Sequence, residues 1–410
     1  MLNNNQSEAV ITQHKRVFVV SGADTGKTTV IFNRINQLIE NKVDSCSILF
    51  ISFTRRTISD IKMKFNQCAD NPVIKTFHGL AFSTLSTTFS KQLVNHQSDL
   101  FMDFDQPTLT QILVKKQEFK IMNVSTKPKT GYQMILDENN LFDYPDLEID
   151  YLSYLKDINH QKTIQNQYKY IFVDEAQDMS KIQVEILNLM VNEDTHLFFV
   201  GDPDQSIYGF RGSIPNQVRI LIKLFKCHTY TLVDCYRCTK SVLEVANKLI
   251  AHNTKRVKKD LVPHQKHLGL VEYHQFSNTK KEALFVLSKI REFLHQKMAL
   301  TDMVILVRNH YMSNDIKTLL SEGYYNDIAC MSIHQAKGLE FKIVFIMGIE
   351  DGPNTSRRVI EEERRLMFVA VTRAKTHLIM TSPSETRVPR FIKEMKMIII
   401  KHKGELSNVI

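Results

Sequence analysis

Residues 19–30, VVSGADTGKTTV, pass from a predicted strand into a predicted helix. An apolar run ends at Val20, a turn with two glycines follows, and a helical pattern begins at Lys27. Such a turn can direct backbone N–H groups and the positive end of the helix dipole at a bound phosphate. Lys27 would supply a positive charge for the terminal phosphates, and Thr28 a hydroxyl for Mg²⁺. The stretch therefore predicts a nucleotide site at the start of an α/β unit.

Two positions of this turn depart from the GxxxxGK[S/T] pattern of phosphate-binding loops. Ser21 stands at the first glycine, and because it is small it is no obstacle. Asp24 tolerates left-handed backbone, but it places a carboxylate near an anionic ligand. If that carboxylate faces the phosphates, we expect Asp24→Gly to tighten nucleotide binding. If it caps the helix or meets a neighbouring cation, we expect the substitution to change little.

A second motif, YKYIFVDEAQD at residues 168–178, ends an apolar run in an acidic pair. Asp174 is placed to hold Mg²⁺ through water, and Glu175 to orient and deprotonate an attacking water. A solvated acidic helix start is the alternative interpretation. The apolar strand before the pair and the GKT loop elsewhere in the chain favour phosphoryl transfer.

Short apolar runs followed by helical patterns recur along the 410 residues. Continuous rather than alternating apolar runs are typical of parallel strands covered on both faces, so we expect an α/β protein with two mostly parallel sheets. Residues 87–165 show polar helical patterning without strand runs, which predicts a helical insertion in the first unit. The predicted strands are 17–21, 47–54, 170–174 and 196–201 in the first unit, and 271–276, 303–307, 342–348 and 376–381 in the second.

Composition narrows the partners and the compartment. With 43% hydrophobic and 24% charged residues, no apolar stretch of roughly 18 residues and a polar N-terminus, we expect a cytoplasmic protein with no membrane partner. A net charge of +9 favours an anionic partner such as nucleic acid, with a solvated basic surface as the alternative. Cys235 and Cys238 have metal-like spacing, but without a second such pair zinc is disfavoured.

Nine motifs follow one another in an order that resembles the superfamily 1 DNA helicases of the UvrD, Rep and PcrA type. They are LNNNQSEAV (2–10), SGADTGKT (21–28), SFT (52–54), TFH (76–78), VDEAQD (173–178), GDPDQSIYGFRG (201–212), YR (236–237), SIHQAKGLEF (332–341) and EEERRLMFVAVTRAK (361–375). The resemblance implies two RecA-like parallel-sheet domains of the P-loop NTPase kind. The N-terminal one, 1A, would comprise 1–86 plus 166–228, the insertion 1B 87–165, and the C-terminal one, 2A, 229–410.

The resemblance also implies ATP and Mg²⁺ as cofactors and assigns residues to them. The loop residues Ser21, Gly22, Ala23, Asp24, Thr25, Gly26, Lys27, Thr28 and Thr29 would surround the phosphates, with Thr28 and Asp174 at the metal. Gln6 would read adenine, Tyr236 would stack on the base, and Glu340 would touch the ribose. The catalytic set would be Lys27, Glu175, the γ-phosphate sensor Gln205, and the arginine fingers Arg237 and Arg373.

Single-stranded or tailed duplex DNA is the partner that the resemblance implies. Phe53, Tyr208 and Phe210 match positions that stack on bases, and stacking contributes roughly 1–3 kcal/mol per base for any sequence. Core packing is the alternative for Phe53. Backbone-contact positions are matched by Thr54, Thr76, His78, Arg211, His334 and Lys337.

The implied activity is 3′ to 5′ movement on DNA, with ATP between the two domains closing and opening their cleft. The chain departs from the family in having no tryptophan, with Phe210 where motif III usually carries one, and only a short connector at about 322–327 where relatives insert the 2B subdomain. Two alternatives remain: a DNA-sensing regulatory ATPase within a nuclease, repair or phage-defence complex, and a P-loop ATPase that does not use DNA. The basic segment 253–267 would contact nucleic acid or form a solvated helix and loop.

Overall fold

Contacts within the computed structural model divide the chain into two compact units. The first unit comprises Met1–Ser21, Lys27–Pro203 and Tyr208–Leu232, and the second comprises Gly22–Gly26, Asp204–Ile207 and Val233–Ile410. Two short segments from the N-terminal half, 22–26 and 204–207, thus belong to the second unit. The structure describes residues 2–65, 71–89, 92–94, 108–113, 115, 131–208, 216–254, 256–323, 325, 327–352 and 356–402.

The first unit is built on a six-stranded sheet in the order β3-β2-β6-β7-β1-β8, with every neighbouring pair parallel. Its strands are β1 (Arg16–Val20), β2 (Ile48–Ile51), β3 (Val73–Lys75), β6 (Tyr170–Val173), β7 (His196–Gly201) and β8 (His228–Thr231). In β1, Val20 lies opposite Gly201 of β7. Because the carboxyl ends of parallel strands meet at one edge of a sheet, the segments that follow β1, β6 and β7 begin at the same edge.

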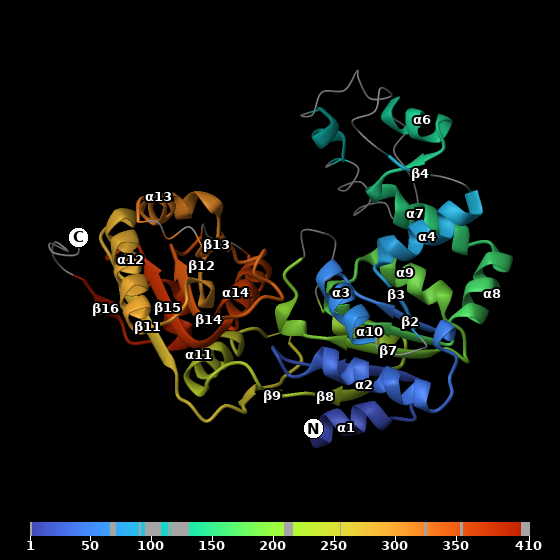
Figure 1. Cartoon of the computed structure of the whole chain (residues 1–410), viewed down its shortest axis with the longest axis horizontal. Coiled ribbons are helices and arrows are strands. Elements are labelled where there is room, and N and C mark those ends of the chain that lie inside the picture. The colour runs from blue at the N-terminus through green and yellow to red at the C-terminus, as the bar shows by residue number, and fades with distance from the viewer. Residues whose placement is uncertain are drawn as a thin grey trace. The chain divides into compact units, whose positions relative to one another are not determined.

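Helices flank this sheet and bury its central strands on both faces (Figure 1). Val17 and Val19 of β1 share one core cluster with Ile31 and Ile35. Phe18, which alternates with them, stacks instead on Phe199 of β7. Continuous apolar strands are therefore confirmed as strands covered on two sides. The helices are α1 (Asn4–Ile11), α2 (Lys27–Glu40), α3 (Arg55–Phe65), α9 (Lys181–Met190) and α10 (Gln217–Leu224), with 3₁₀ turns η1 (Ser45–Ser47) and η3 (Ala176–Asp178).

Helices dominate the described part of the insertion between β3 and β6, as predicted. They are α4 (Phe77–Phe89), α6 (Gly131–Glu138), α7 (Tyr144–Leu155) and α8 (Ile158–Gln167). Helix α4 packs on α7, and both α7 and α8 contact α9 of the first unit. A pair of two-residue parallel strands, β4 (Gln92–Leu93) and β5 (Leu141–Phe142), was not predicted, because strands this short carry no readable apolar pattern.

The second unit contains another six-stranded parallel sheet, in the order β13-β12-β14-β15-β11-β16. Its strands are β11 (Leu270–Gln275), β12 (Met303–Val307), β13 (Ala329–Ser332), β14 (Phe341–Met347), β15 (Ala374–Ser382) and β16 (Ile400–Lys401). A separate parallel pair joins β9 (Asp234–Cys235) to β10 (Val262–Pro263). The prediction of two α/β units with parallel sheets is confirmed.

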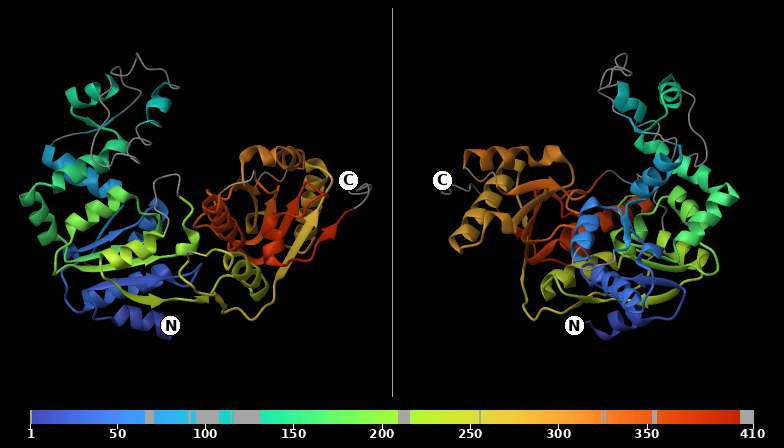
Figure 2. Two further views of the ribbon diagram at one scale, coloured as in Figure 1. Left: turned by 180° about the vertical axis from the view of Figure 1, so that it is seen from behind. Right: turned by 45° about the vertical axis from the view of Figure 1, so that its right-hand side comes forward.

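Helices also cover the second sheet (Figure 2). Ile290 and Phe293 of α12 and Ile316 of α13 form a core cluster with Ile305 and Phe345 of the sheet. After β12 the chain forms a 3₁₀ turn, η7 (His310–Ser313), followed by α13 (Asn314–Glu322). The remaining elements are α11 (Lys240–Ile250), α12 (Thr279–His295), α14 (Arg357–Val371), α15 (Arg390–Met395), η4 (Pro203–Gln205) and η6 (Leu300–Asp302). In the described part of the chain no helix has the length and apolar character needed to cross a membrane.

Glu282 is a buried carboxyl in the second unit that makes stability depend on pH. Its side chain accepts hydrogen bonds from the Gly348 N–H at 2.9 Å and the Thr381 hydroxyl at 2.6 Å. Burial raises the pKa of Glu282 to about 7, so between its unfolded pKa of about 4.3 and about 7 the folded chain holds more protons than the unfolded chain. The free energy of unfolding therefore falls as pH rises through that window.

We expect Glu282→Gln to remove this pH-dependent loss, because the amide keeps the acceptor oxygen without a charge. Relative to the unaltered protein, the free energy of unfolding should rise by up to about 3 kcal/mol at about pH 8 and show no gain at about pH 4. Denaturant unfolding at the two pH values measures this, with the exposed Glu322→Gln as control. An equal gain at both pH values would contradict the prediction.

Candidate active site

The loop 22–26 lies between β1 and α2 and is tightly wound. Asp24 and Gly26 both have left-handed backbone, with φ of 51° and 81°. The Thr25 hydroxyl accepts a hydrogen bond from the Gly22 N–H at 3.2 Å. A Cβ at Gly22 would lie 2.0 Å from Leu261 Cδ2, so a side chain there would displace Leu261. These features match a loop whose N–H groups turn inward, the arrangement that binds phosphate.

The Asp24 carboxylate meets a cation, which is one of the two alternatives that its sequence left open. Its Oδ1 accepts from Arg237 Nη2 at 3.2 Å, and its backbone oxygen accepts from the Tyr236 N–H at 3.1 Å. Arg237 Nε also donates to Glu340 Oε2 at 2.8 Å. The Arg237 guanidinium therefore lies between two carboxylates.

The sequence predicted little change on Asp24→Gly if the carboxylate meets a cation, but that cation is Arg237, itself a predicted ATP contact, which alters the expectation. Asp24→Gly should strengthen ATP binding, because it frees Arg237 and removes a negative charge beside the phosphate loop. Glycine suits the φ of 51° at this position. The carboxylate is about one-third exposed, so the effect is modest, at about fivefold in Kd. Titration with a fluorescent ATP analogue measures it. Asp24→Asn, which removes only the charge, should shift the Kd in the same direction, whereas weaker binding by either variant would disprove the interpretation.

In the first unit, Lys27 and Glu175 form a partly buried ion pair with Nζ to Oε1 at 3.0 Å. Burial lowers the pKa of Lys27, but the carboxylates of Glu175, Asp202 and Asp174 outweigh burial and hold that pKa above its ordinary value. The ammonium therefore remains charged. Glu175 has a φ of 51°, which is uncommon for a residue other than glycine and marks strain of the kind found at functional sites.

Gln177 positions Glu175, a role that was not predicted from the sequence. Its Nε2 donates to Glu175 Oε2, and its Oε1 accepts from the Asp202 N–H at 2.9 Å. A Cβ at Gly201 would lie 2.7 Å from Gln177 Oε1, so the glycine makes room for this side chain. An amide two residues after the acidic pair was the available sequence indication.

In the second unit, the predicted catalytic residues Gln205 and Arg373 are in contact. Arg373 Nη2 donates to Gln205 Oε1 at 3.3 Å, and Lys337 Nζ donates to the Gln205 backbone oxygen at 3.1 Å. Arg373 is buried, and its guanidinium also donates to the carbonyls of Val369 at 3.0 Å and Leu339 at 2.9 Å. This arginine is therefore fixed in direction before any ligand binds.

Glu340 has two cationic partners, Arg237 and Lys375, the latter at 2.6 Å. Burial raises the pKa of Glu340, but Lys375 and Arg237 lower it by a larger amount. The pKa of Glu340 therefore lies below its ordinary value.

The Tyr236 ring lies 4.7 Å from the His264 ring at a tilt of 47°. In the first unit, Gln6 takes part in the capping box of α1, where its Oε1 accepts from the Asn3 N–H at 3.0 Å.

The remaining predicted phosphate-site residues lie between the end of β1 and the first turn of α2. Ala23 is buried, Thr28 is half-buried and Thr29 is exposed. Ser21 donates its hydroxyl to the Gly201 carbonyl at 3.0 Å, which joins the end of β1 to the end of β7. A small polar residue is thus accommodated at this position without distorting the strand.

Several predicted DNA-contact residues have structural contacts of their own. The half-buried Phe53 lies 5.9 Å from Phe77, ring to ring. Thr54 accepts from the Thr57 N–H at 3.1 Å and Thr76 from the Gly79 N–H at 3.0 Å, each at a helix start. His78 Nδ1 lies 3.6 Å from Glu148 Oε1. Tyr208 and His334 are half-buried. Phe210 and Arg211 lie outside the described residues.

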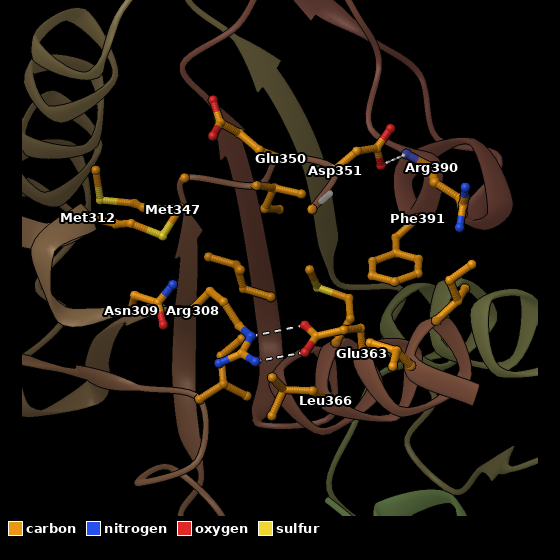
Figure 3. A pocket seen from close by; sticks show the side chains of 18 of the residues that line it. Arg308, Asn309, Met312, Met347, Glu350, Asp351, Glu363, Leu366, Arg390 and Phe391 are labelled. Carbon is orange, nitrogen blue, oxygen red and sulfur yellow. Dashed lines mark hydrogen bonds and ion pairs between the residues drawn. The ribbon is translucent and has the colours of Figure 1, made fainter. Parts of the chain in front are cut away.

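A pocket of about 450 Å³ lies at the carboxyl ends of β12 and β14, and no predicted site residue lines it (Figure 3). Arg308 makes a bidentate ion pair with Glu363 there, with N–O distances of 2.7 and 2.9 Å. Asp351 accepts from the Arg390 N–H at 2.7 Å. Ligands of parallel sheets bind at strand carboxyl ends, so the position of Arg308 directly after a predicted strand could have indicated this pocket.

Cys235 and Cys238 are buried free thiols. Across the described residues, histidine, cysteine and acidic side chains form no group of three or more that could hold a metal ion.

Profiles of two known domains match consecutive parts of the chain. The UvrD/REP helicase N-terminal domain matches residues 2–135 and 125–226, and the UvrD-like helicase C-terminal domain matches 230–324 and 319–385. The ATP-dependent DNA helicase PcrA of Leuconostoc citreum is 28% identical over 89% of this chain and 55% of its own length. A probable DNA helicase of Mycoplasma pneumoniae is 26% identical over 99% of this chain and 88% of its own length. The chain thus spans about half the length of that PcrA and most of the length of the Mycoplasma pneumoniae relative.

Proposed function

Because the chain belongs to the UvrD/REP helicase family, we propose that it is an ATP-dependent DNA helicase or translocase that moves 3′ to 5′ on single-stranded DNA. The observation that carries this proposal is the partly buried Lys27–Glu175 pair at the edge where β1, β6 and β7 end. A charged lysine after a phosphate loop and a carboxylate held by Gln177 are the two groups that nucleoside triphosphate hydrolysis requires.

ATP and Mg²⁺ are the proposed cofactors, and the residues present fit them. The wound loop 22–26 suits phosphate, and the Thr28 hydroxyl and Asp174 carboxylate are the oxygen donors that Mg²⁺ prefers. When bound, Mg²⁺ would neutralise charge on the phosphate oxygens. Glu175 would accept a proton from the attacking water, with Gln177 fixing the direction of its carboxylate.

We assign Arg237 and Arg373 to the same reaction, as cations for the charge that develops during phosphoryl transfer, and Gln205 as the sensor of the terminal phosphate. Support comes from the direct Arg373–Gln205 hydrogen bond. Tyr236, Glu340 and Gln6 would bind the nucleoside. The DNA-stacking roles of Phe53, Tyr208 and Phe210, the division into 1A, 1B and 2A, and a cytoplasmic location remain part of the proposal.

A second candidate is a DNA-sensing regulatory ATPase that works with a nuclease or repair partner and unwinds little by itself. The observation that favours it is the connection between α13, which ends at Glu322, and β13, which begins at Ala329. This connection is too short to hold the additional 2B subdomain, which is inserted there in the helicases that the sequence resembles. ATPase and translocation are therefore better supported than processive strand separation.

The decisive experiment combines ATP hydrolysis with and without single-stranded DNA and unwinding of duplexes with 3′ or 5′ tails. The proposal expects strong stimulation of hydrolysis by DNA and unwinding from 3′ tails only. Stimulation and translocation without unwinding would favour the regulatory ATPase. Hydrolysis that is the same with and without DNA would exclude both and leave a P-loop ATPase that does not use DNA.

A further inference from the structure

Asp204 of the second unit lies in a buried ionic cluster with Arg256 and Lys259, termed the Asp204 cluster. Lys259 Nζ lies 2.6 Å from Asp204 Oδ2, and Arg256 donates to both carboxylate oxygens at 3.2 and 3.0 Å. The relative exposures of Asp204, Arg256 and Lys259 are 1%, 8% and 6%. Burial raises the pKa of the Asp204 carboxyl, but Lys259 and Arg256 outweigh burial and hold it below its ordinary value.

These contacts apply to two basic residues of the segment 253–267, whose other described lysines, Lys258 and Lys266, are exposed, as expected of a solvated loop. Arg256 and Lys259 are neither solvated nor presented to a polyanion, because their charged groups are buried on one carboxylate. No helix forms over the described residues between α11 and α12. Lys258, between the two buried cations, is exposed and is the natural comparison. Burying three charged groups is costly and adds little net stability, so the cluster calls for a role in fixing structure.

The residue that the cluster can fix is Gln205. Asp204 directly precedes it in the turn η4, so anchoring Asp204 restrains the backbone from which the Gln205 side chain projects. Gln205 itself accepts two hydrogen bonds. Its Oε1 accepts from Arg373, and its backbone oxygen accepts from Lys337. The segment 204–207 is therefore held from two directions, by the Asp204 cluster and by Arg373 with Lys337.

We propose that Arg256 and Lys259 are positioning residues for ATP hydrolysis, which hold Asp204 so that Gln205 is directed at Arg373. The inference rests on the proposed function, because it takes Gln205 as the group that senses the terminal phosphate. Both cations bond to Asp204, and through it they act on Gln205. If Arg256 and Lys259 no longer held Asp204, the Gln205 side chain would shift from its position at Arg373. A displacement of about 1 Å can lower the rate of catalysis by about a hundredfold.

The first experiment is independent of activity. Hydrogen exchange of the full chain should show faster exchange across residues 203–207 in Lys259→Met than in the unaltered protein, by about tenfold or more, because the segment opens locally. Lys258→Met should leave this exchange unchanged. If Lys259→Met also leaves it unchanged, the proposal is overturned, whether or not the protein hydrolyses ATP.

The second experiment is a double-mutant cycle on kcat at saturating ATP and DNA. We expect Lys259→Met to lower kcat by about tenfold to a hundredfold, with DNA affinity without nucleotide unchanged. In a Gln205→Ala background, Lys259→Met should cause no further loss, because it acts through Gln205. Losses that multiply in the double variant, or equal losses of DNA affinity in Lys258→Met and Lys259→Met, would overturn the proposal.

Arg256→Lys is a milder variant, for use if Lys259→Met does not fold. It keeps a cation beside Asp204 but loses the bidentate hydrogen bonding of the guanidinium. It should give a smaller fall in kcat than Lys259→Met and obey the same cycle with Gln205→Ala. If DNA fails to stimulate hydrolysis in the unaltered protein, the proposed function fails, while the exchange experiment still decides the role of the Asp204 cluster.

Discussion

Glu175→Gln is expected to lower kcat for ATP hydrolysis by about a hundredfold to ten-thousandfold while ATP binding persists, because it removes the general base and little else. Glutamine preserves the length of the side chain beside Gln177, but it cannot accept the proton of the attacking water. Phosphate release measures the rate, and titration with an ATP analogue measures binding. Glu185→Gln, an exposed position on α9, is the control and should behave as the unaltered protein.

Lys27→Ala distinguishes the role of Lys27 from that of its ion-pair partner Glu175. It should abolish hydrolysis and also weaken ATP binding, because it removes the charge that faces the terminal phosphates. Glu175→Gln should instead leave binding equal or slightly tighter, since Lys27 loses the carboxylate 3.0 Å away that competes with phosphate. Near-normal turnover in Glu175→Gln would exclude this carboxylate as the base.

Arg373→Lys is expected to reduce kcat by about a thousandfold, close to the loss of an arginine finger. Lysine keeps the charge, but it cannot bond simultaneously to Gln205, Leu339 and Val369 as the guanidinium does. The fall should appear in kcat rather than in the Kd for DNA. Single-turnover hydrolysis with DNA in excess measures it.

Arg364→Lys is the matched control for Arg373→Lys, because both are buried arginines of the second unit. Arg364 bonds to Glu394 at 2.7 Å, and its role in the described contacts is structural. We expect both variants to lower the melting temperature, but only Arg373→Lys to lower kcat. Equal falls in kcat would show that loss of packing, rather than loss of a transition-state contact, explains the effect.

The central strands of both sheets could be predicted from sequence, because strands buried on two faces must be apolar throughout. The edge strands could not. Strand β8 reads HTYT and is largely exposed, β13 reads ACMS and is half-buried, and β3 has only three residues. An edge strand is restrained by hydrogen bonds to one neighbour and by the rest of the fold, and neither leaves an apolar pattern in the sequence.

In the candidate site, too, some features could be predicted from the sequence and others could not. Asp174 and Glu175 directly follow β6, and Lys27 begins α2 after the loop that follows β1, so their positions in the fold could be predicted from the sequence, while their chemistry remains a proposal. The partnership of Asp24 with Arg237 spans 213 residues, and that of Asp204 with Lys259 spans 55. Ion pairs between distant residues have no local spacing, so their partners could be found only in the folded chain.

Membership of the segment 204–207 in the second unit also affects how the protein can fold. A fragment that begins at Val233 would contain Arg256 and Lys259 but not Asp204, the buried carboxylate that both cations contact. Two cations would then be buried without their carboxylate, which strongly destabilises a fold. During synthesis, the second unit thus closes around a segment made before it. Its independent expression would require that segment to be supplied.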